Sequence, residues 1–112
     1  MEYGVSSELP ADDDRQAAWA EQRANRGFDS TELWNLDVTF SRFVLPRLKA
    51  FAEDLHGYPS GMTEEAWLAE LHKMIAAFEL CVDANPMVTA KQERVITVGL
   101  NSFRKYFFNL WS

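Results

Sequence analysis

The sequence predicts an all-α fold, a small helical bundle of about four helices, from three observations. Apolar residues recur every three or four positions in long segments, which is the period of a helix buried on one side. Glycine or proline separates these segments, and no segment shows the apolar–polar alternation and β-branched enrichment of a strand. A chain of 112 residues has room for one hydrophobic core. We therefore expect a single helical domain over residues 12–112, preceded by a flexible N-terminal arm over residues 1–11.

The first predicted helix runs from about Asp12 to Arg26. Acidic residues at its start suit the positive end of the helix dipole, and Gly27 is a natural C-terminal stop. Its apolar side is weak, since Trp19 is the one large apolar side chain on it. We expect this helix to dock through that indole and to be the least stable element.

The second predicted helix starts near Asp29 or Ser30, where Asp29 and Glu32 have capping-box spacing, and stops before Gly57. Its predicted core stripe consists of Leu33, Leu36, Phe40, Phe43, Val44, Leu48, Phe51 and Leu55. Pro46 interrupts the stripe, because proline lacks a backbone donor and clashes with the preceding turn. A kink over residues 42–45, or a division into two shorter helices, is the expected result.

The third predicted helix has Thr63 as its N-cap, and Met62 and Trp67 have the spacing of a hydrophobic staple. Its predicted core residues fall within about 140° of one another on a helical wheel. They are Trp67, Leu68, Leu71, Met74, Ile75, Phe78, Cys81 and Val82. This is the most regular amphipathic pattern in the chain.

The fourth predicted helix begins at Asn85 and Pro86, which read as N-cap and first-turn proline. Its predicted core residues are Ile96, Leu100, Phe103, Phe107, Leu110 and Trp111. Gly99 lies in mid-helix, where glycine costs about 1 kcal/mol relative to alanine unless a neighbouring helix needs the close approach.

Composition and motifs exclude several functional classes. A single Cys81 excludes an internal disulfide framework and fits a reducing, cytoplasmic location. No apolar run approaches the roughly 18 residues of a membrane span. A pI near 4.8 disfavours general nucleic-acid binding. There is no phosphate-binding glycine loop and no catalytic or metal-ligand motif, so we expect no enzyme activity, no cofactor and no metal site.

Two charged residues fall within the apolar stripe of the second helix, namely Asp37 and Arg47. Buried charges need partners, so each is expected to be paired. One interpretation is structural, with Asp37 capping a neighbouring helix and Arg47 holding carbonyl groups or Glu79. The other is a polar pocket between helices in which Arg47 faces an anionic ligand.

The C-terminal part of the chain is basic and aromatic, whereas residues 1–32 carry a net charge of −5. The candidate cations there are Lys91, Arg94, Arg104 and Lys105. They either attract the acidic front half or hold an anionic ligand. Trp34 and Tyr106 are candidates for stacking on a base. Phe108 falls outside the predicted core stripe, which indicates a contact surface for another protein or subunit.

Three blocks of this sequence resemble short proteins of unknown activity encoded by tailed phages and prophages. The blocks are residues 27–51, 57–80 and 99–111, and they carry the patterns W-x-L-D, L-P-R-L and G-L-x-x-F-x-x-Y-F-x-x-L-W. The resemblance implies a phage setting, and hence the cytoplasm of a host cell. It supplies no catalytic residues.

Two functions are compatible with these features. The first is a phage-type accessory protein that binds a host or phage protein, for example to inhibit a host defence factor. The alternative is a non-catalytic binder that sequesters an anionic nucleotide signal. A homo-oligomer is compatible with either, because the last helix has more apolar surface than one small bundle needs.

Overall fold

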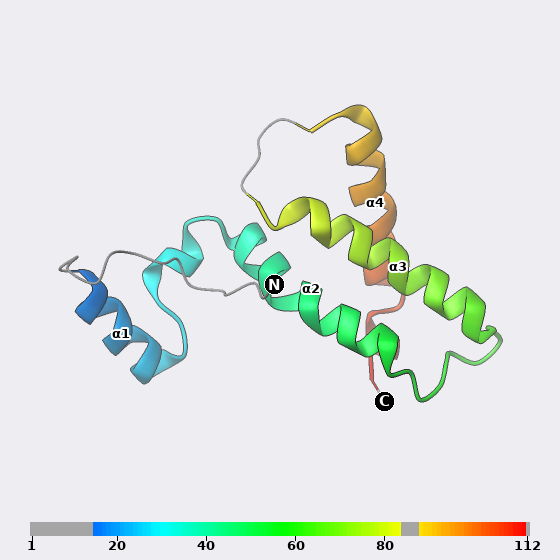
Figure 1. Cartoon of the computed structure of the whole chain (residues 1–112), viewed down its shortest axis with the longest axis horizontal. Coiled ribbons are helices and arrows are strands. Elements are labelled where there is room, and N and C mark those ends of the chain that lie inside the picture. The colour runs from blue at the N-terminus through cyan, green and yellow to red at the C-terminus, as the bar shows by residue number, and fades with distance from the viewer. Residues whose placement is uncertain (1–14, 84–87, 112) are drawn as a thin grey trace.

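The structure is a computed structural model that describes residues 15–83 and 88–111 (Figure 1). The predicted arm, the acidic residues 12–14 and the Asn85-Pro86 pair lie outside these residues. The all-α prediction is confirmed, with no strand in the described part. Its elements are α1 (Arg15–Arg26), the 3₁₀ turn η1 (Ser30–Leu33), α2 (Leu36–Glu53), α3 (Glu64–Cys81), α4 (Ala90–Lys105) and the 3₁₀ turn η2 (Phe107–Asn109).

Helix α3 is the centre of the molecule. It packs against both α2 and α4, while α1 lies off to one side of these three helices (Figure 1). The core cluster consists of Leu45, Leu48, Trp67, Leu71, Met74, Phe78 and Val82. Most of these belong to α3, because a central helix must bury side chains toward two neighbours. None of the helices described is long and apolar enough to cross a membrane.

The prediction for α3 is confirmed almost residue by residue. Thr63 caps it, since its side chain accepts a hydrogen bond from the backbone N–H of Ala66 at 3.1 Å. The predicted face is the buried one, with Trp67 only 1% exposed. Ala77 is also fully buried, although its small side chain gave no sign of this in the pattern.

The predicted start of α2 is wrong. The capping box of Asp29 and Glu32 forms, but it caps the short turn η1, and the long helix begins only at Leu36. Of the two alternatives at Pro46, the division into two helices does not occur, because α2 continues through Pro46 to Glu53. Leu45 and Leu48 on either side of Pro46 are buried in the core, and their burial offsets the roughly 3 kcal/mol cost of an interior proline.

Helix α4 begins at Ala90 rather than at Asn85 and Pro86. Thr89 is its N-cap and forms a complete capping box with Gln92, which satisfies two backbone donors at the helix start. The helix ends at Lys105. The predicted apolar stripe therefore extends past the helix into η2 and the C-terminal segment.

The contact between α3 and α4 depends on small side chains. A methyl group on Gly99 would come within 2.3 Å of both the Ala77 methyl group and the Lys73 carbonyl oxygen. Ser102 is buried and donates to the Glu70 carbonyl and carboxylate oxygens, at 3.2 and 3.0 Å. The close approach that would justify Gly99 in mid-helix is thus present.

Candidate functional site

A set of large apolar side chains on α2, α4 and η2 remains open to solvent. We call this set the aromatic face; its members are Leu36, Phe40, Phe43, Leu100, Phe107 and Phe108. Each is at least 43% exposed, and Phe108 reaches 88%.

Ring contacts make this face continuous from α2 to η2. Phe40 lies edge-to-face against Phe103 with ring centroids 6.1 Å apart, and Phe103 meets Phe107 at 5.6 Å. Phe107 meets Phe108 at 5.5 Å. Phe78 of the core contacts both Phe40 and Phe103, at 5.8 and 5.3 Å. The exposed rings therefore rest on the hydrophobic core.

The rotation of α2 and α4 about their axes explains this exposure. On α4 the residues that face α3 are Gly99 and Ser102, so Leu100 is turned outward. On α2 the buried positions are Val38, Ser41, Leu45 and Leu48. They lie about 150° around the helix from the Leu36, Phe40 and Phe43 stripe. The predictions that Leu36, Phe40, Phe43 and Leu100 are core residues are therefore wrong. The predictions for Leu33, Phe107 and Trp111 are wrong as well, because these residues lie outside α2 and α4 and are exposed.

The aromatic face is large for a chain of this size. With about 150–250 Å² per large side chain, the exposed parts amount to roughly 500–800 Å². The largest apolar patch on a typical monomer is about 300–600 Å², and such patches often carry function. A stable protein interface covers about 800 Å² on each partner. The face thus supplies most of the area that one such interface needs.

Arg47 borders the aromatic face and is exposed, in contrast to the expectation of a buried charge. Its guanidinium lies 3.9 Å from the ring centre of Phe43 and donates to the Phe43 carbonyl oxygen at 2.8 Å. It therefore does hold a carbonyl group, but one of its own helix. Glu79 pairs instead with Lys49, at 3.5 Å.

Asp37 is exposed as well, so the prediction that it projects into the core is wrong for the same reason, the rotation of α2. It lies near the end of α3, where burial and the negative charge of Asp37 raise the pKa of the Cys81 thiol. The pair is remote from any pocket described below.

The cations predicted to hold an anion are exposed and do not converge. Lys91 and Arg94 lie at the start of α4, and Arg104 and Lys105 at its end. The Lys105 ammonium lies 5.3 Å from the ring centre of Tyr106. Tyr106 in turn packs edge-to-face against Trp67, with centroids 5.5 Å apart. Tyr106 therefore supports a core side chain and does not present a free stacking surface.

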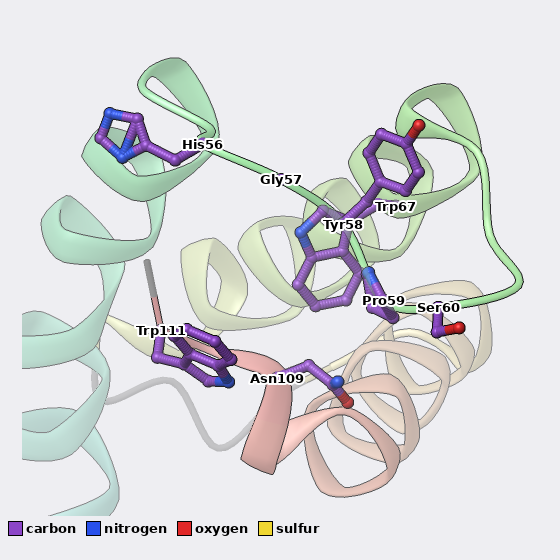
Figure 2. Close-up of a pocket in the computed structure, with 8 residues that line it drawn as sticks. All are labelled: His56, Gly57, Tyr58, Pro59, Ser60, Trp67, Asn109 and Trp111. Carbon is purple, nitrogen blue, oxygen red and sulfur yellow. The ribbon is translucent and has the colours of Figure 1, made fainter.

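A pocket of about 280 Å³ opens between the α2–α3 loop and the C-terminal segment (Figure 2). Its lining consists of His56, Gly57, Tyr58, Pro59, Ser60, Trp67, Asn109 and Trp111. None of the predicted cations lines it. In the sequence, residues 56–63 indicated only a break between helices. The signal available there was a Tyr-Pro pair between two glycines, next to the aromatic start of α3.

A third feature links α1 to η1. Asp29 is fully buried, and one of its carboxylate oxygens accepts from the Arg23 guanidinium at 2.6 Å. Trp19 is buried as predicted, and it meets Trp34 edge-to-face with centroids 5.7 Å apart. Trp34, a candidate stacking residue, is 59% exposed. The rest of its ring surface is partly used by the contact with Trp19 of α1. The capping pattern predicted Asp29 as a cap but gave no sign of its ion pair.

No group of three or more potential metal ligands occurs within residues 15–83 and 88–111. In comparisons with known proteins, no family model, no curated protein and no solved structure matches this chain. The function must therefore be argued from the surfaces of the chain itself.

Proposed function

We propose that this protein acts by binding another protein through the aromatic face, as a phage-type accessory protein that inhibits a host factor. The observation that carries the proposal is the face itself, a set of exposed apolar side chains on α2, α4 and η2 whose rings are linked from Phe40 to Phe108 through the half-buried Phe103. The phage setting comes from the sequence resemblance described above. In this proposal, the bound protein inhibits the host factor because it covers a surface that the host factor needs for its own activity.

The rim of the face indicates the chemistry of the partner. Arg47 is exposed beside Phe43 and keeps donors that its one carbonyl contact leaves unused. A carboxylate at the edge of the partner's apolar surface would pair with it. We therefore expect a partner with an apolar surface bordered by acidic residues.

Affinity capture from a host lysate, with matched variants, tests this proposal. The double variant Phe43→Ser/Phe108→Ser removes two exposed rings of the aromatic face. Val98→Ser changes a similarly exposed apolar residue of α4 outside that face and is the control. We expect the wild type and the control to retain one saturable partner, and the double variant to lose it. Equal capture by all three proteins would contradict the proposal.

Light scattering separates a host partner from a second copy of the chain. If the wild type is a dimer and Phe43→Ser/Phe108→Ser is a monomer, the aromatic face serves self-association. The proposal of a host partner on that face then fails. A monomeric wild type that captures a partner through the face supports it.

A further inference from the structure

The pocket in Figure 2 is lined by Trp67, whose indole N–H has no acceptor among the described residues. The Trp67 side chain as a whole is 1% exposed. Every fully buried side-chain nitrogen or oxygen atom of the described residues has a hydrogen-bond partner. The Trp67 Nε1 atom has none, so it retains some contact with solvent. Trp67 lines the pocket, so its indole N–H is available there to the acceptor of a ligand that displaces water.

The walls of the pocket are flat, apolar rings. In Figure 2 the indoles of Trp67 and Trp111 lie on either side of the opening, and the nitrogen of Trp67 is on the side of its ring nearer Trp111 and His56. Trp111 is 75% exposed and Tyr58 is 56% exposed. Rings this accessible have free faces for contact with a ligand. Asn109 and Ser60 add polar groups at the edge.

These features match one ligand class best. We propose that this pocket binds a proline-rich peptide segment in the polyproline II conformation. A peptide carbonyl accepts the hydrogen bond of Trp67 Nε1–H, and a prolyl ring packs against Trp111. Polyproline II segments expose their carbonyl groups, prolines carry no N–H, and aromatic-lined grooves are their usual receptors. A pocket of about 280 Å³ accommodates a short stretch of such a peptide rather than a large cofactor.

Charge around the pocket favours a peptide with a basic flanking residue. Asp54 is 83% exposed and lies 3.7 Å from His56 of the pocket lining. Glu64 is exposed and stands three residues before Trp67, hence on the same side of α3. A nucleotide fits less well, because none of the cations discussed above lines the pocket. The proposal uses no residue of the aromatic face and is independent of the proposed function.

Titration of ¹⁵N-labelled protein, followed through its four indole N–H signals, tests the site. The probe is a decapeptide of prolines with one arginine at each end. We expect the Trp67 and Trp111 signals to shift with saturation, and those of Trp19 and Trp34 to stay. Trp67→Phe, which deletes the N–H, should weaken binding about two- to tenfold, the effect of one neutral hydrogen bond. Trp111→Ala should weaken it about 30-fold, and Phe108→Ala should leave it unchanged.

Three results would overturn the inference. The first is the absence of any saturable shift at Trp67 in folded wild-type protein. The second is equal binding of a peptide in which glycine replaces each proline, because the attraction would then come from the arginines alone. The third is a folded Trp67→Phe protein that binds as tightly as the wild type. Circular dichroism of each variant shows whether a loss of binding is a loss of fold.

Discussion

Gly99 shows how a single missing methyl group sets the geometry of this molecule. The Gly99 Cα atom faces the Lys73 carbonyl group and Ala77 of α3. A residue with a Cβ atom at this position would clash with both groups, so glycine allows α4 to approach α3 closely. This approach rotates the α4 stripe outward and exposes Leu100.

We therefore expect Gly99→Ala to destabilise the protein by about 1–3 kcal/mol, although alanine is the better helix former. Urea unfolding measures the change. Gly57→Ala is the matched control, because nothing lies within 4 Å of its added methyl group and its backbone is not left-handed. The control should be neutral or gain up to about 1 kcal/mol. A Gly99→Ala protein as stable as the wild type would mean that the helices do not meet at this point.

Glu70 gives the α3–α4 contact a pH dependence. A hydrogen bond from Lys73 at 2.5 Å is the main cause that lowers the pKa of the Glu70 carboxyl below 4.5, with a further contribution from Ser102. A carboxyl whose pKa is lowered by folding stabilises the protein above the unfolded-state pKa of 4.5. That contribution is lost as the pH falls through the lower folded-state value.

We expect Glu70→Gln to be less stable than the wild type at pH 7, and the difference to shrink below about pH 4.5. Urea unfolding of both proteins between pH 3 and pH 7 provides the measurement. A difference that stays constant over this range would show that the carboxylate charge contributes nothing to the contact.

At the scale of elements, the accuracy of the sequence predictions follows the strength of the packing. The α3 pattern predicted its own buried face because α3 has neighbours on two sides. The same reasoning was wrong for α2 and α4, since each has one main partner and more apolar surface than that partner covers. The spacing of apolar residues shows how much of a helix is apolar. In α4, however, the small residues Gly99 and Ser102 determine which side of the helix packs against α3. The pocket depends on a loop and a C-terminal segment without periodicity, so no helical pattern predicted it.

Helix α1 is joined to the start of η1 by the Arg23–Asp29 ion pair, whose carboxylate is fully buried. We expect Arg23→Ala to weaken this attachment by about 1–3 kcal/mol, since hydrogen bonds to a charged group are the strong ones. Amide hydrogen exchange should become faster in α1 and stay unchanged in α3. Arg26→Ala is the control, because Arg26 bonds to the Phe28 carbonyl at an exposed position and stacks on the Phe28 ring, and Phe28 lies outside η1. Faster exchange throughout α3 in the Arg23 variant would show that α1 supports the core.

At the scale of the whole molecule, the described residues leave a group of large apolar side chains open to solvent on α2, α4 and η2. The sequence pattern correctly placed Phe108 outside the core, but it placed Phe40, Phe43 and Phe107 in the core and Arg47 among the buried charges. The sequence indicated that the last helix has more apolar surface than a small bundle can bury. The rotation of α2 and α4 explains why much of this apolar surface is exposed.

Site-specific photo-crosslinking tests most directly whether the aromatic face is a binding surface. A photoreactive phenylalanine at position 108 lies within the face, and the same group at position 98 lies on α4 outside it. In host extract, position 108 should give one covalent adduct with a host protein, and excess unlabelled protein should compete it away, while position 98 gives none. Adducts of equal yield at both positions, or adducts only with a second copy of this chain, would contradict the account.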